Sequence, residues 1–334
     1  MMQAPAWWWR TPPAAVARAL LPAASVYGWV SRTRRRCSRA RNQGVPVVCV
    51  GNLVVGGAGK TPATLAIAHR LAAAGLAVHF ATRGYGGRLA GPVRVDPACH
   101  TFKDVGDEAL LLARRAPAWV ASKRAAGVQA AADGAHVVVM DDGFQNPSVR
   151  PDLAFVVIDA GQGFGNGLVF PAGPLREPAG EGLARASCVV IVGPAHPADA
   201  VADVVARSGV RVLKATLLTR IPPALAGQRM LAFAGIGRPD KFFAGLQAAG
   251  GMLCATRAFP DHHPFSEQEL KALITDAERL DANLVTTEKD AVRLPPWAKS
   301  GVAVAEADFA WVAPAELDSV LHPVLARAQA RGDR

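Results

Sequence analysis

The chain alternates short runs of β-branched residues with longer stretches rich in alanine and leucine. Short apolar runs bounded by glycine or proline are typical of buried strands, and the longer stretches are typical of helices. In the first two thirds of the chain we expect strands at Val47–Val50, Ala77–Thr82, Val137–Met140, Ala154–Ile158 and Cys188–Val192, and helices at Pro62–Ala74 and Glu108–Arg115. This alternation predicts an α/β fold around a mostly parallel sheet.

A second, smaller α/β unit is expected to begin near Met230. Its predicted elements are strands at Leu231–Ala234, Met252–Arg257 and Asn283–Thr286, with helices at Pro239–Ala249 and Ser266–Ala277. Val212–Leu218 and the break at Ile221-Pro222-Pro223 are predicted to connect the two units. We therefore divide the chain into an N-terminal segment (1–42), a large domain (43–220) and a smaller C-terminal domain (221–334).

Composition excludes a disordered chain and a disulfide scaffold. Apolar residues make up 51% of the sequence and charged residues only 19%, which is typical of globular domains. The five cysteines are scattered without a C-x-x-C pair, so neither disulfides nor a zinc site are expected, and a reducing compartment fits. The formal net charge of +10 indicates an anionic partner.

The positive charge is concentrated at the N-terminus. The first acidic residue is Asp96, and residues 1–42 hold 8 arginines and the run Trp7-Trp8-Trp9. The longest uncharged segment there is Ala19–Ser31, 13 residues that include Pro22, whereas a membrane-spanning helix needs about 17–25. We expect an interfacial helix, with indole rings at the headgroup level and arginines on anionic lipid.

Basic segments of this kind also occur in signal peptides, transit peptides and nucleic-acid-binding arms. In a signal peptide the charges precede the apolar region, but here the densest cluster follows it, which favours retention in the cytoplasm. An organellar transit peptide and nucleic-acid binding through the arginine run remain alternatives. Because we prefer the interfacial helix to these alternatives, no nucleic-acid partner is expected.

Glycine-rich residues follow the first predicted strand and precede a helix, in the order Gly56-Gly57-Ala58-Gly59-Lys60-Thr61. In this context backbone N–H groups can surround phosphate oxygens, and the helix N-terminus adds positive charge. Lys60 would neutralise the phosphates of ATP, and the Thr61 hydroxyl would ligate Mg²⁺. The match is imperfect, because Val54 occupies the position of the usual first glycine.

Paired carboxylates, Asp141 and Asp142, end the predicted strand Val137–Met140. A buried strand that runs into such a pair is typical of a Mg²⁺-positioning motif. The alternative is a strand that ends in a helix cap or an Asx turn. Adjacent residues of an extended chain point to opposite sides, so one carboxylate could hold the metal while the other orients water or the loop.

Together these stretches resemble the family of tetraacyldisaccharide 4'-kinases of lipid A biosynthesis. The resemblance covers roughly residues 45–295 in family order. Besides the glycine-rich loop it includes Thr82-Arg83-Gly84-Tyr85-Gly86-Gly87, Val105-Gly106-Asp107-Glu108, Asp141-Asp142-Gly143-Phe144-Gln145, Pro171-Ala172-Gly173-Pro174-Leu175-Arg176-Glu177, Phe259-Pro260-Asp261-His262-His263 and Thr286-Thr287-Glu288-Lys289-Asp290.

The resemblance implies transfer of the ATP γ-phosphate to the 4'-hydroxyl of an acylated disaccharide 1-phosphate. It further implies a P-loop kinase-like domain with a second, smaller α/β domain, a site in the cleft between them, and work at the cytoplasmic face of the inner membrane. Acyl-chain preference and oligomeric state stay open.

The resemblance also implies roles for individual residues. Asp107 is expected to act as catalytic base with His262 as its partner, although an acidic residue at this position is also typical of a helix start. The remaining expectations concern metal and substrate contacts: Gln145 and Glu177 join Asp141 and Asp142 at the metal, and Arg124 and Arg176 contact an anionic ligand.

A different class, a membrane-surface ATPase switch of the partition or septum-site type, also has a loop of this kind. That class carries an additional lysine where this chain has Val55, and its membrane helix tends to be C-terminal. Both features count against it.

Overall fold

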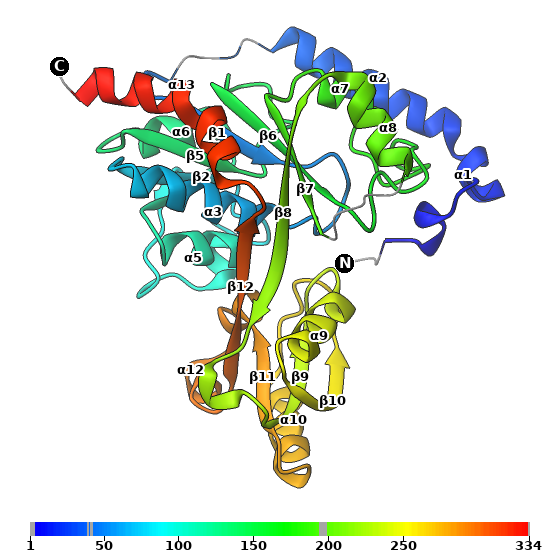
Figure 1. Cartoon of the computed structure of the whole chain (residues 1–334), viewed down its shortest axis with the longest axis vertical. Coiled ribbons are helices and arrows are strands. Elements are labelled where there is room, and N and C mark those ends of the chain that lie inside the picture. Colours follow the sequence, from blue (N-terminus) through cyan, green and yellow to red (C-terminus); the bar gives the residue numbers. More distant parts are fainter. Residues whose placement is uncertain (1–3, 39, 41–42, 194–198, 333–334) are drawn as a thin grey trace.

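The computed structural model describes residues 4–38, 40, 43–193 and 199–332 and confirms the predicted α/β fold. Within these residues a sheet of 12 strands runs through two units in the order β10-β9-β11-β12-β8-β7-β6-β1-β5-β2-β4-β3 (Figure 1). The strands are β1 (Val47–Gly51), β2 (Val78–Thr82), β3 (Val93–Arg94), β4 (Ala118–Val120), β5 (Val137–Asp141), β6 (Leu153–Asp159), β7 (Cys188–Val192), β8 (Arg211–Arg220), β9 (Arg229–Ala234), β10 (Met252–Ala258), β11 (Asn283–Thr287) and β12 (Ala303–Trp311).

Helices cover both faces of the large unit, residues 43–220 with the C-terminal helix α13. One face packs Ile67, Leu112 and Leu321 into a core, and the other packs Val128 and Leu183. The helices are α3 (Lys60–Ala73), α4 (Phe102–Val105), α5 (Asp107–Ala113), α6 (Arg124–Ala131), α7 (Ala179–Leu183), α8 (Asp199–Ser208) and α13 (Pro314–Gly332). Strands buried on both faces read as continuous apolar runs, which is why they were predictable.

The small unit, residues 221–305, hangs below the large one in Figure 1. Its helices are α9 (Pro239–Ala248), α10 (Glu267–Arg279), α11 (Glu288–Ala291) and α12 (Pro296–Lys299). Two long strands join the units, because residues 306–311 of β12 pair antiparallel with residues 215–220 of β8. The predicted connection at Val212–Leu218 is thus a strand, and its partner β12 was not predicted.

The last helix, α13, returns to the large unit. Leu317, Leu321 and Val324 lie in the same core cluster as Ile67 and Leu71 of α3. The predicted range of the C-terminal domain, 221–334, assigned this helix to the small unit. The packing of these side chains places it against the large one instead, because β12 carries the chain back across the boundary (Figure 1).

The N-terminal segment forms α1 (Ala15–Ala19) and α2 (Leu21–Cys37), with Pro22 in the first turn of α2. Pro22 therefore separates the two helices rather than breaking one, since proline is tolerated in a first turn. Of the predicted anchor, residues 1–3, 39 and 41–42 lie outside the described part. Among the described residues, no helix combines the length and apolar character that crossing a bilayer requires.

Candidate active site

The glycine-rich loop lies between β1 and the start of α3 at Lys60. Gly56 (φ +116°) and Gly59 (φ +81°) adopt left-handed conformations that favour glycine. A Cβ atom at Gly56 or Gly57 would meet no atom within 4 Å, so the loop borders open space. The Lys60 ammonium donates a hydrogen bond to the Gly56 carbonyl at 3.3 Å, and its burial lowers its pKa. The loop opens into a cleft of about 2040 Å³ between the units.

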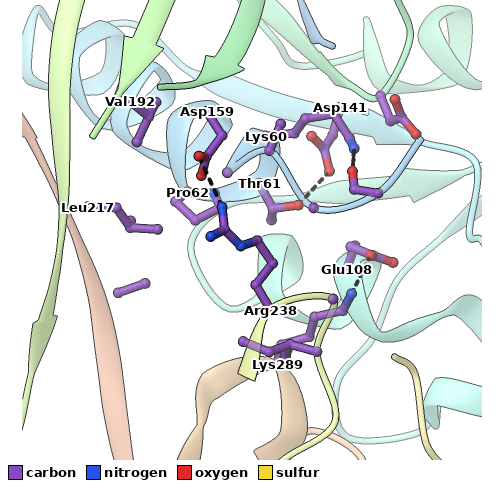
Figure 2. Close-up of a pocket in the computed structure, with 18 of the residues that line it drawn as sticks. Lys60, Thr61, Pro62, Glu108, Asp141, Asp159, Val192, Leu217, Arg238 and Lys289 are labelled. Carbon is purple, nitrogen blue, oxygen red and sulfur yellow. Dashed lines mark hydrogen bonds and ion pairs between the residues drawn. The ribbon is translucent and has the colours of Figure 1, made fainter. Parts of the chain in front are cut away.

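Asp141 ends β5 beside this loop, as parallel neighbours β1 and β5 require. Its Oδ1 accepts a hydrogen bond from the Thr64 hydroxyl at 2.8 Å, and its Oδ2 accepts one from Thr61 at 3.2 Å. Burial raises the pKa of Asp141. Figure 2 shows the Thr61 hydroxyl pointing at this carboxylate, so the two predicted metal-site groups lie together.

Asp142 follows with φ +47°, a left-handed conformation that a non-glycine residue adopts at a cost. Arg176 holds its carboxylate at 2.9 Å. Burial alone would raise the pKa of Asp142, but the charges of Lys60 and Arg176 more than offset this and lower it. The two carboxylates thus have different partners, but the cause is the turn at Asp142 and not the predicted alternation along a strand, because β5 ends at Asp141.

Arg124 supports the same turn from α6. Its Nη2 donates to the Asp142 carbonyl at 2.9 Å. Its Nη1 is buried and, among the described residues, has no hydrogen-bond partner, and burial lowers the pKa of the guanidinium. Since the side chain lines the cleft, Arg124 offers a donor to an anion.

Gln145 and Glu177 lie behind the acidic pair. The Gln145 amide nitrogen donates to the Asn52 carbonyl at 2.8 Å and to Glu177 at 3.3 Å. The fully buried Glu177 carboxylate forms ion pairs with Arg185 at 2.8 Å and Arg35 at 3.1 Å. Gln145 lines the cleft but Glu177 does not, and the metal role expected of Glu177 stays a prediction.

Asp107 starts α5, and the structure brings it to His262 of the small unit. Nδ1 of His262 lies 2.8 Å from Oδ2 of Asp107. Burial alone would raise the pKa of Asp107, but the His262 hydrogen bond and the charge of Lys289 hold it well below its usual range. His262, at φ +60°, and the adjacent Glu108 line the cleft, while Asp107 lies directly behind them and is 3% exposed.

Lys289 completes this cluster and was missed as a site residue. Its ammonium lies 3.1 Å from Glu108, 3.3 Å from Asp261 and 3.2 Å from Nε2 of His262. Burial alone would lower the pKa of Lys289, but the surrounding carboxylates raise it. Burial raises the pKa of Glu108 to about 7. The only signal in the sequence was the position of Lys289 in the stretch Thr286-Thr287-Glu288-Lys289-Asp290.

A second ion cluster across the cleft was also missed. Asp159, at the end of β6, pairs with Arg238 of the small unit at 3.1 Å (Figure 2). It also pairs with Lys241 of the same unit at 2.5 Å. The tip beside Arg238 approaches the glycine-rich loop, since a Cβ at Gly237 would lie 3.5 Å from the Gly57 nitrogen. The position of Asp159 at the carboxyl end of a parallel strand could have indicated it as a site residue, because ligands bind at that edge of such sheets.

A parallel sheet with a glycine-rich loop after β1 and a carboxylate at the end of the neighbouring strand β5 defines a P-loop nucleotide-binding fold. The comparisons with known proteins narrow this class. The sequence profile described as "Tetraacyldisaccharide-1-P 4'-kinase" matches residues 16–326. The chain belongs to the tetraacyldisaccharide 4'-kinase family.

Relatives of this name match along nearly the whole chain. The one from Rhodospirillum centenum is 51% identical, covering 97% of each sequence, and the one from Paramagnetospirillum magneticum is 48% identical, covering 98% of this chain and 100% of its own. A solved LpxK structure from Aquifex aeolicus, described as an "apo" form in complex with ATP, shares the fold with a TM-score of 0.73 at 22% identity, covering 93% of this chain and 99% of that one.

Proposed function

We propose that this protein transfers the γ-phosphate of ATP to the 4'-hydroxyl of a tetraacyldisaccharide 1-phosphate, a lipid A precursor. The observation that carries the proposal is one cleft lined by the loop of Lys60, the acidic pair Asp141–Asp142 and, from the other unit, His262. Phosphoryl transfer demands mainly positioning and charge neutralisation, which these groups can supply. The names of the relatives specify the acceptor.

The residues fit ATP with Mg²⁺. The open space at Gly56 and Gly57 leaves room for phosphate oxygens against the backbone N–H groups. Hydroxyl and carboxylate oxygens, the ligands that Mg²⁺ prefers, are provided by Thr61 and the acidic pair. The metal would neutralise charge on the transferred phosphate, and the buried Nη1 of Arg124 would donate to a phosphate oxygen.

We assign proton acceptance to Asp107 and His262 as a pair. The hydrogen bond of 2.8 Å that lowers the pKa of Asp107 also raises the pKa of His262, so within the pair the imidazole is the stronger base and Asp107 stabilises its protonated form. Because His262 lines the cleft and Asp107 lies behind it, the sugar hydroxyl would meet the pair from the His262 side. The pair forms across the two units, which links proton acceptance to closure of the cleft.

We place the reaction at the cytoplasmic face of the inner membrane. The outer side of α2 exposes Val26 (62%), Trp29 (63%) and Val30 (50%). Exposed apolar side chains of this size on a basic helix are typical of an interfacial element. The cleft extends toward it, since Trp7, Tyr27 and Phe170 line its rim. An acylated acceptor could thus keep its chains near the bilayer while its sugar enters the cleft.

The test is incubation of the purified protein with γ-labelled ATP, Mg²⁺ and separate acceptors: the tetraacyldisaccharide 1-phosphate, its monosaccharide counterpart and an unrelated phospholipid. We expect label on the disaccharide alone and ATP consumption that depends on it. Equal ATP hydrolysis with no acceptor, and no labelled lipid, would contradict a kinase and favour the ATPase switch.

A further inference from the structure

Helix α2 turns two of its arginines inward rather than toward lipid. Arg32 pairs with Glu181 of α7 at 2.9 Å, and Arg35 pairs with Glu177 at 3.1 Å and Glu181 at 3.3 Å. The Arg35 side chain is only 17% exposed, and the Glu177 carboxylate is completely buried. These two arginines thus have partners within the protein, and binding of the arginine run to anionic lipid stays a prediction.

From Glu177, the buried partner of Arg35, a series of hydrogen bonds and ion pairs leads to the active site. Glu177 accepts a hydrogen bond from Gln145, which also donates to the carbonyl of Asn52 next to the glycine-rich loop. Arg176, the neighbour of Glu177, donates to the Gln145 amide oxygen at 3.2 Å and pairs with Asp142. Every link in this chain is a direct contact.

A second contact joins the end of α2 to the segment 142–147, which carries Asp142 and Gln145. The Ser38 hydroxyl, just after the helix, donates to the Pro147 carbonyl at 3.3 Å, two residues beyond Gln145. Asp142, at the start of this segment, has a left-handed backbone that the surroundings must maintain. The end of α2 thus braces the segment that carries the acidic pair.

We infer that Arg35 is a positioning residue for phosphoryl transfer: through Glu177 it holds Gln145 and Arg176, and thereby the Asp142 carboxylate, in place. Glu177 needs its partners because an uncompensated buried carboxylate is costly. With Arg35 removed, Arg185 is the one cation still paired with Glu177 among the described residues, and the carboxylate that accepts from Gln145 is no longer held from the α2 side. The same helix that exposes Val26 and Trp29 to a membrane therefore orients groups at the phosphates.

The inference rests on the proposed kinase function, and the experiment separates the two. The full-length protein and the variants R35A, R35K and R257A are assayed with the disaccharide acceptor in detergent micelles, with ATP and acceptor each varied while the other is saturating. Arg257 is the control, since R257A also removes one positive charge; it loses one ion pair, with Asp276 at 3.1 Å in the small unit outside the cleft, where R35A loses two.

We expect R35A to lower kcat about tenfold with KM for the acceptor changed less than about twofold, R35K to recover part of the loss, and R257A to match the parent protein. Vesicle sedimentation of R35A should stay close to that of R257A, and its unfolding temperature should fall below that of R257A, because Glu177 is buried, but stay above the assay temperature. If the parent protein labels no lipid, the proposed function fails. If it does, and R35A matches R257A in kcat or loses only acceptor affinity, the inference is overturned.

A double variant tests the route through Glu177. Residues that act through one another have effects that do not multiply. The kcat of the double variant R35A/E177Q should be at most about twofold lower than that of the slower of the two single variants. A loss equal to the product of the single losses would show that Arg35 does not act through Glu177.

Discussion

The carboxylate of Asp107 in the large unit and the imidazole of His262 in the small unit form a hydrogen bond of 2.8 Å across the cleft. Neither unit holds both groups, and His262 lines the same cleft as the glycine-rich loop. Chemistry at this position therefore requires both units to be in place, and the consequences can be tested separately for each group.

Asp107→Asn and His262→Gln should each lower kcat for phosphorylation of the disaccharide by at least about tenfold, equivalent to about 1.4 kcal/mol in the barrier. The reason is that each change removes one half of the proposed proton acceptor. Steady-state kinetics at saturating ATP and acceptor provide the measurement. Asp276→Asn, which removes a partly exposed carboxylate of the small unit outside the cleft, serves as control, and full activity of Asp107→Asn would exclude it as base.

Lys60→Ala should lower turnover by at least about tenfold and weaken ATP binding, because it removes the cation nearest the open loop. Binding of a fluorescent ATP analogue and the kinase assay measure the two effects. Lys271→Ala removes an exposed lysine paired with Glu267 at 2.8 Å and should change neither. Unchanged ATP affinity and turnover in Lys60→Ala would contradict the proposed phosphate contact.

The stability contributed by His262 should depend on pH. Burial alone would lower its pKa, but the hydrogen bond with Asp107 more than offsets this and raises it. A raised pKa means that the folded protein binds the proton more tightly than the unfolded chain, so the contribution is complete below about 6.5 and is lost as pH rises through the folded-state pKa.

The stabilising difference between the parent protein and His262→Gln should therefore be larger at pH 6 than at pH 9. A hydrogen bond to a charged group contributes about 1.5–3 kcal/mol, which sets the scale at pH 6. Urea unfolding at both pH values measures the difference. A difference that grows toward pH 9 would mean that the imidazole is held neutral.

Replacing Val26 and Trp29 of α2 with serine should weaken binding to anionic vesicles. Burying one large apolar side chain is favourable by about 1.5–3 kcal/mol, so the double change should lower vesicle affinity at least about tenfold. Sedimentation with vesicles measures it. The matched control is Trp297→Ser in α12 of the small unit, another exposed tryptophan (47%); equal binding by all three proteins would contradict the proposed membrane surface.

Local motifs made much of the fold and site predictable. The central strands β1, β5, β6 and β7 are buried along their whole length and are almost entirely apolar. The glycine-rich loop comes after β1, and Asp141 ends β5. Long-range partners were not predictable in the same way. The pairing of β12 with β8 depends on register between segments far apart in sequence, and β12 alternates apolar with charged residues such as Glu306 and Asp308.

The same limit applies to side-chain clusters. Lys289 and the partners of Asp159 come from the other unit, so no spacing in the sequence relates them to the groups they contact. Glu177 was expected at a metal because the family resemblance implied it, and its own stretch of sequence gives no information on distant partners. Its contact with Arg35 became visible only when α2 was placed against α7.

The return of α13 to the large unit has a consequence for how the chain can be divided. Topologically the small unit is an insertion between β8 and α13, so a fragment that stops at residue 220 lacks Leu317, Leu321 and Val324 and leaves the apolar surface around Ile67 and Leu71 uncovered. Separate expression of the nucleotide-binding half would need a short loop from Arg220 of β8 to Glu306 of β12, which pair with each other, so that β12 and α13 are kept. A simple truncation at the linker would remove part of that half's own interior.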